Sequence, residues 1–145
     1  MTILVSDIET TWNRDRVWCI GILDVDTEQY QDYHGNTLPA AIKRLEQADM
    51  IVGHNWKGFD HHVLVKLNDA NLSKDNVFDT YELSKRICVE RTSHKLESWG
   101  KTLDYAKGDF REFNRFSQRM LDYLQSDVFL TFGVYHHLVN RMKGI

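Results

Sequence analysis

The sequence predicts an α/β fold in which a mixed central β-sheet carries helices on its faces. Two apolar runs of strand length come first, at residues 2–5 and 17–23. From residue 37 onward, patterns typical of helices alternate with patterns typical of strands. Strands that pair antiparallel at the start, followed by strands with helices between them, indicate a mixed sheet.

The first predicted elements are three strands and a helix. Residues 2–5 are apolar and partly β-branched, as a buried strand requires. Residues 17–23 are apolar nearly throughout, which predicts a central strand, and residues 29–34 predict a third strand with a polar face. Residues 37–48 predict a helix, because Pro39 lies near its first turn, where the missing N–H of proline costs nothing.

The later elements alternate between strand and helix. Residues 50–53 and 77–78 are short apolar runs and predict strands, and residues 59–68 between them have apolar side chains along one helical face. Residues 96–103 predict a bent helical piece. Residues 117–142 predict one long helix, because apolar side chains recur along a single stripe.

Composition predicts one globular domain, residues 1–145, with an ordinary core. The hydrophobic share is 42% and the charged share 27%, with one proline. A net charge of −3 argues against a protein that binds nucleic acid by bulk charge, but an enzyme that recruits cations is compatible with it.

No apolar run approaches the ~20 residues of a membrane helix, and no basic leader precedes the first strand. We therefore expect no membrane association and a cytoplasmic location. Cys19 and Cys88 lack metal-like spacing and are predicted to be reduced core thiols.

Four acidic residues fall at the ends of predicted elements. Asp7 and Glu9 end the first strand, Asp60 begins a helix, and Asp127 lies within the last helix, one turn after Tyr123. Asp7 and Glu9 are two positions apart and so face the same side of a strand, where their charges repel. Divalent cations would offset this repulsion, since Mg²⁺ prefers carboxylate oxygens and paired ions support phosphodiester hydrolysis.

Three short motifs carry a resemblance to a known family. They are "SDIET" at residues 6–10, "HNWKGFD" at residues 54–60 and "YLQSD" at residues 123–127. Their order and content resemble the DEDD superfamily of 3′→5′ exonucleases, and in particular the proofreading exonuclease domain of phage family-A DNA polymerases. The tyrosine subclass fits, because the histidine subclass needs a histidine at the position of Asp122. The resemblance covers roughly residues 3–138 and implies a ribonuclease-H-like fold.

The resemblance also implies a role for each site residue. Asp7 would bridge two divalent cations, Mg²⁺ or Mn²⁺, and Glu9 and Asp127 would complete the site that holds the attacking water. Asp60 would support the second metal, largely through waters. Tyr123 would orient the nucleophilic water.

Further residues are implied to contact the substrate. Thr10 and the main chain around Ile8 would face the terminal nucleotide, and Asn55 would steady the turn of the second motif. His94 and Leu96 match a stretch near the substrate.

Structural interpretations compete with these roles. Asp79, with Glu82, has the spacing of a capping box for the next helix and is left out of the site. Adjacent histidines on a helix point about 100° apart and cannot chelate one ion, so the pairs at residues 61–62 and 136–137 are predicted to be surface histidines. The four tryptophans, at residues 12, 18, 56 and 99, are predicted to be mostly core, with Trp12 or Trp56 as the candidate to line the substrate cleft and stack on a base.

Three functions follow as hypotheses. The first is a metal-dependent 3′→5′ exonuclease that releases mononucleotides from single-stranded or frayed DNA 3′ ends. The second is an RNA-trimming exoribonuclease of the same superfamily, since no motif reads the 2′-OH. The third is a non-catalytic nucleic-acid-binding module. The phage resemblance adds a separate DNA polymerase as a partner to be tested.

Overall fold

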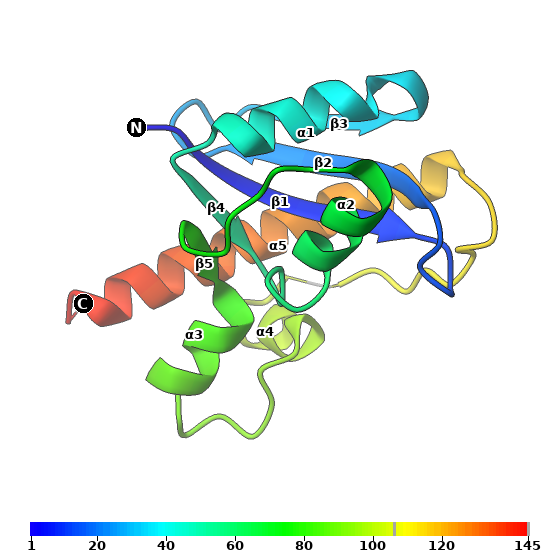
Figure 1. Ribbon diagram of the computed structural model, residues 1–145. Helices are drawn as coiled ribbons and strands as arrows, with labels where there is room; N and C mark the ends of the chain where they lie inside the picture. The colour runs from blue at the N-terminus through cyan, green and yellow to red at the C-terminus, as the bar shows by residue number, and fades with distance from the viewer. Residues whose placement is uncertain (106, 145) are drawn as a thin grey trace.

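The protein forms a five-stranded sheet with helices on both faces (Figure 1). The structure is a computed structural model that describes residues 1–105 and 107–144. The strands are β1 (Ile3–Thr10), β2 (Val17–Asp24), β3 (Tyr30–His34), β4 (Met50–Gly53) and β5 (Val77–Asp79). The helices are the 3₁₀ turn η1 (Gly35–Thr37), α1 (Leu38–Gln47), α2 (Asp60–Asn68), α3 (Thr80–Ile87), α4 (Leu96–Thr102) and α5 (Gln118–Met142).

The sheet is mixed, with β1 at its centre. The strand order is β3-β2-β1-β4-β5. The first three strands pair antiparallel, and β1, β4 and β5 pair parallel. The α/β fold class with helices on a mixed sheet is therefore confirmed.

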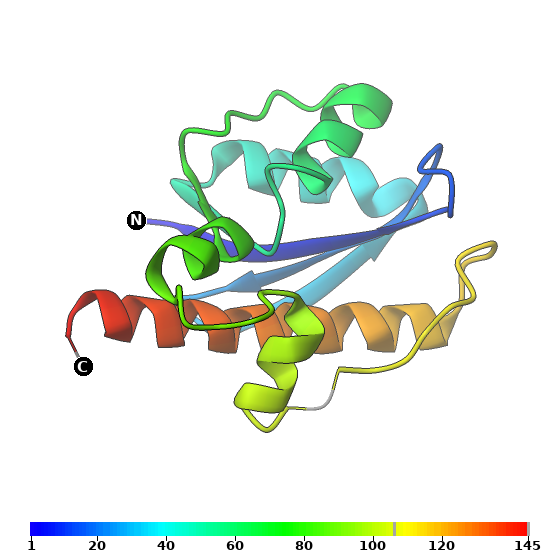
Figure 2. The same ribbon diagram turned by 90° about the horizontal axis from the view of Figure 1, so that it is seen from below.

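Two helical layers enclose the sheet. In Figure 2 the sheet lies between α5 on one side and α1 with α2 on the other. The core divides accordingly: one apolar cluster lies under α1 and α2, and a second lies between the sheet and α5. Both cysteines are buried free thiols, as predicted. Among the helices of the described ranges, none is both long and apolar enough to cross a membrane.

The first strand is longer than the sequence predicts. Asp7 and Glu9 were expected at its end, as the structure shows, and β1 continues past the apolar run to Thr10 because its pairing with β2 continues. Asp7 faces Gly21 and Glu9 faces Cys19 in that pairing, and the register shifts between Glu9 and Thr10. The two acidic residues are thus held inside the sheet.

The neighbouring strand β4 ends early and leaves room beside these acidic residues. It pairs with β1 only from Ile3 to Val5. Beyond Val5 the chain of β4 turns away toward α2 (Figure 1). A crevice at the carboxyl ends of parallel strands is the usual ligand position in open α/β sheets.

Candidate active site

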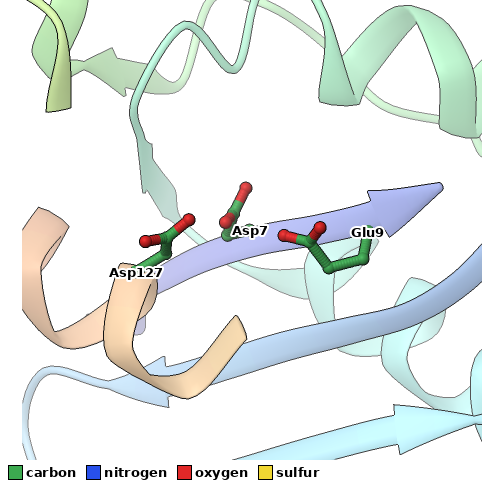
Figure 3. A group of neighbouring side chains, drawn as sticks. All are labelled: Asp7, Glu9 and Asp127. Atoms are coloured by element: carbon green, nitrogen blue, oxygen red, sulfur yellow. The ribbon is translucent and has the colours of Figure 1, made fainter. Parts of the chain in front are cut away.

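Three carboxylates meet at the face of β1 that α5 covers. Asp7 and Glu9 point from β1, and Asp127 points from α5 toward them (Figure 3). One oxygen from each lies within 4.8 Å of the others, and no other group of this kind occurs in the described ranges. The fold therefore brings together the first motif, residues 6–10, and the third motif, residues 123–127.

The surroundings of these carboxylates oppose their ionisation. Burial, followed by repulsion from Asp127, raises the pKa of Asp7 to about 7. Burial, followed by repulsion from Asp7, raises the pKa of Glu9 to about 10. The pKa of Asp127 rises to about 6 through burial, which the cation of Lys107 partly counteracts. A divalent cation among the three would remove this repulsion, so the donor set fits a hard metal ion.

Asp60 lies next to this group without joining it. It is the first residue of α2, its side chain is buried, and its Oδ2 has no hydrogen-bond partner in the described structure. Burial, and then the charge of Asp7, raises its pKa well above the ordinary value. An unpartnered buried carboxylate oxygen beside Asp7 fits a role toward a second cation or its waters.

Tyr123 lies one helical turn before Asp127, as its spacing predicts. Its ring packs against Phe110 and Phe113, and its hydroxyl accepts a hydrogen bond from the ammonium of Lys107. Burial, followed by the charge of Asp127, raises the pKa of the hydroxyl, so it is protonated at neutral pH.

Lys107 is a site residue that the sequence analysis missed. Its Nζ lies 3.1 Å from Asp127 Oδ1 and 3.2 Å from Oδ2, and 4.2 Å from the centre of the Tyr123 ring. It comes from the segment between α4 and α5 and belongs to none of the motifs. Charge balance could have predicted a basic residue at this site, because a buried group of carboxylates needs a cation even without metal.

The second motif is held in place by Asp79. This buried carboxylate accepts hydrogen bonds from the backbone N–H groups of Asn55 and Lys57, at 2.9 and 3.0 Å. It also accepts from Tyr81 and Glu82 at the start of α3, which confirms its predicted capping role. Asn55 has a left-handed backbone, with φ of 54°, at the turn that it was expected to steady.

A pocket of about 310 Å³ opens onto the carboxylates. Ile8 and Thr10 line it, as expected of residues that face a terminal nucleotide, and Trp12 lines it with a ring that is 65% exposed. Trp56, in contrast, is fully buried in the core. Of the two tryptophans proposed to line the cleft, Trp12 alone does so.

The remaining predicted residues lie outside this pocket. The His94 Nδ1 is 2.6 Å from the hydroxyl of Ser84, and Leu96 begins α4 and packs against the cluster beneath α5. Neither side chain lines the pocket. Of the histidine pairs, His61 contacts the Leu72 carbonyl and His62 is exposed.

Comparison with known proteins identifies the family. The model of the RNase H superfamily matches residues 4–139. The chain belongs to the RNase H superfamily. It is a nuclease of this superfamily, whose members use divalent metal ions, and the carboxylate group described above is of the kind that binds them.

Individual relatives agree with this assignment. The chain is 26% identical to the DNA-directed DNA polymerase of Escherichia phage T7, over 94% of this chain and 26% of the polymerase. It therefore spans about a quarter of the length of that relative, and the same holds for the polymerase of Enterobacteria phage T3.

Solved structures share the fold. Brucella melitensis NrnC bound to pGG matches with a TM-score of 0.76 and 21% identity, over 97% of this chain and 73% of that one. The family B DNA polymerase of Pyrobaculum calidifontis matches with a TM-score of 0.73 and 16% identity, over 96% of this chain and 24% of the polymerase.

Proposed function

We propose that residues 1–145 form a 3′→5′ exonuclease domain of the tyrosine subclass, which releases nucleoside monophosphates from single-stranded or frayed DNA 3′ ends. The observation that carries the proposal is the convergence of Asp7, Glu9 and Asp127 within 4.8 Å, with the Tyr123 hydroxyl one helical turn away. The likeness to phage DNA polymerases favours DNA as the substrate.

The carboxylates would hold the divalent cations. Asp7, Glu9 and Asp127 would hold one ion, and Asp7 with Asp60 would hold a second. Bound Mg²⁺ or Mn²⁺ supplies charge stabilisation for the phosphoryl group and lowers the pKa of water.

The remaining site residues position the reactants. The protonated Tyr123 hydroxyl can donate a hydrogen bond to the attacking water or accept one from it, and so orient it toward the phosphorus. Thr10 and the main chain around Ile8 line the pocket where the terminal nucleotide would lie.

An exoribonuclease activity is the second candidate. The fold of NrnC bound to pGG matches 97% of this chain, and a short RNA is accordingly a substrate to test beside DNA. A separate DNA polymerase as partner is a further proposal, which rests on the likeness to polymerases alone.

The test is digestion of end-labelled DNA and RNA oligonucleotides with Mg²⁺ or Mn²⁺, each with a free or phosphate-blocked 3′ end. We expect stepwise shortening from a free 3′-OH, slower digestion when that end is blocked, and no activity in excess EDTA. Cuts in circular single strands would contradict an exonuclease, and the ratio of the DNA and RNA rates would decide between the two substrates.

A further inference from the structure

Two grooves lead away from the catalytic pocket. The first, which we call the α2 groove, is a pocket of about 170 Å³ lined by residues that include Arg14, Phe59, His62 and Lys66. It shares Arg14 and Phe59 with the catalytic pocket and therefore adjoins it. The second, the α4 groove, has a volume of about 530 Å³ and shares Trp12 and Tyr123 with the catalytic pocket.

The α2 groove is basic. Arg14, His62 and Lys66 are exposed, and no acidic side chain lines this groove. Within the described part of the chain, neither Arg14 nor Lys66 forms a salt bridge. Two cations without a carboxylate partner in the described structure are thus available to bind anions, on a protein with a net charge of −3.

The entrance of this groove also offers a stacking surface. The guanidinium of Arg14 lies 4.7 Å from the centre of the Phe59 ring. Arginine planes and aromatic rings are surfaces on which unpaired bases stack. This pair lies where the catalytic pocket meets the α2 groove.

The charges of the α4 groove are largely compensated. Arg111 Nε lies 3.2 Å from Asp109, and Lys107 is paired with Asp127. Glu97 adds a further negative charge to the lining. This groove is larger than the α2 groove but has no comparable excess of positive charge, so charge rather than volume distinguishes the two routes.

We propose that the single strand upstream of the terminal nucleotide leaves the site through the α2 groove, with Arg14 and Lys66 bound to its phosphates. This inference rests on the proposed function, because it takes the occupant of the catalytic pocket to be a nucleotide. The occupant of the α2 groove is then a single-stranded oligonucleotide, whose phosphates complement the unpaired cations and whose bases stack at Arg14 and Phe59.

The test compares two double variants with equal loss of charge. Arg14→Asn with Lys66→Gln removes the cations of the α2 groove, and asparagine tolerates the left-handed backbone of residue 14, with φ of 61°. The control is Lys101→Gln with Arg111→Gln, on the α4 side. Binding of a 5′-fluorescent octanucleotide with a terminal phosphorothioate linkage is measured by anisotropy in Mg²⁺ at several salt concentrations, beside a dinucleotide.

The α2-groove variant should bind the octanucleotide roughly tenfold more weakly at low salt, with a smaller loss for the dinucleotide. In this variant the negative slope of log affinity against log salt concentration should become shallower by about 0.7 for each phosphate contact removed. The control variant should keep the wild-type affinity and slope. An equal loss in both variants, an unchanged slope in the α2-groove variant, or a wild type that does not bind the octanucleotide would overturn the assignment of the groove.

Binding and hydrolysis separate the two proposals. A wild type that binds with the expected charge dependence but degrades no unmodified oligonucleotide supports the groove and contradicts the exonuclease. If the wild type degrades oligonucleotides, and only the Lys101→Gln, Arg111→Gln variant binds the octanucleotide more weakly, the assignment of the α2 groove is wrong. The proposed exonuclease activity is then still supported.

Discussion

At the scale of single residues, Lys107 and Tyr123 form one unit with Asp127. The Lys107 ammonium contacts both the Asp127 carboxylate and the Tyr123 hydroxyl. Burial lowers the pKa of Lys107, but the charge of Asp127 and the bond to Tyr123 outweigh burial, so the net direction is upward and the side chain is a fixed cation. In the absence of metal it compensates the carboxylate nearest to it.

Removal of this cation should strengthen metal binding. Lys107→Met keeps an unbranched side chain of similar size but removes the ammonium that competes with a metal ion for Asp127. We expect Mn²⁺ to bind roughly fivefold more tightly, since partly exposed ion pairs contribute up to about 1 kcal/mol, and the metal-free protein to melt at a lower temperature. Calorimetric titration with Mn²⁺ checks this, with exposed Lys101→Met as the control. Weaker Mn²⁺ binding in Lys107→Met would mean that the lysine helps to hold the site together.

Tyr123 should affect hydrolysis more than metal binding. Tyr123→Phe keeps the ring contacts with Phe110 and Phe113 and removes the hydroxyl alone. We expect hydrolysis to slow by roughly ten- to a few hundred-fold, the lower part of the range for orienting groups, with metal affinity and melting temperature near those of the wild type. Asp127→Ala, one turn away, should lower both hydrolysis and metal-induced stabilisation. Full activity of Tyr123→Phe would make the tyrosine a packing residue.

At the scale of secondary-structure elements, Asp79 connects α3 to the loop of the second motif. One carboxylate caps the helix and also binds two backbone N–H groups of that loop, which are 24 and 22 residues away in the sequence. The cap is predictable from sequence, because its signal lies within four residues. The contacts with the loop are not, because they depend on β4 and β5 lying side by side.

Asp79→Ala should therefore cost more than the loss of an ordinary cap. A cap contributes about 1 kcal/mol, and each of the two part-buried N–H groups left unpaired costs about 1 kcal/mol, the low end of the range for buried donors. We expect a loss of roughly 3 kcal/mol in the free energy of unfolding, measured with urea. The exposed Asp75 provides a matched control, and Asp75→Ala should change stability little. A loss near 1 kcal/mol for Asp79→Ala would show that the loop contacts contribute nothing.

The elements themselves were largely predictable, and the errors have a common cause. Apolar runs and helical stripes are local signals, and nearly every predicted element is present. The apolar run marks only the first part of β1, because acidic residues interrupt it while pairing with Gly21 and Cys19 of β2 continues the strand. Contacts distant in sequence also decide which groove is basic, and no local pattern reveals that Arg14 and Lys66 share one groove.

At the scale of the whole molecule, the carboxylate group makes stability depend on pH and metal. The folded-state pKa of Asp7 is raised from 3.8 to about 7. A carboxyl whose pKa is raised on folding contributes stability that is complete below its unfolded pKa and is lost as the pH rises through its folded pKa. The contribution of Asp7 should accordingly decline between pH 3.8 and about 7.

The difference between wild type and Asp7→Asn reports this contribution together with the repulsion that Asp7 exerts on Glu9 and Asp60. In EDTA, the melting temperature of the wild type should fall relative to that of the variant as the pH rises from 3.8 to 7. The opposite effect of buried His54, whose pKa burial lowers to about 4, is common to both proteins and cancels. With Mn²⁺, which binds ionised carboxylates, the wild type should instead gain stability toward pH 7. Differential scanning calorimetry measures both series, and parallel curves for the two proteins in EDTA would refute the account.

The central position of β1 has a consequence for hydrogen exchange. Backbone amides in a strand with neighbours on both sides exchange only through large-scale opening, whereas segments without regular structure exchange through local fluctuations. The amides of Leu4 and Val5, which pair with both β2 and β4, should be among the slowest to exchange. Those of residues 107–117, which carry Lys107 against the site, lie outside any helix or strand and should exchange early. The carboxylates of β1 are then fixed for as long as the sheet is intact. The ammonium of Lys107, in contrast, can leave and return to Asp127 many times before the protein unfolds once.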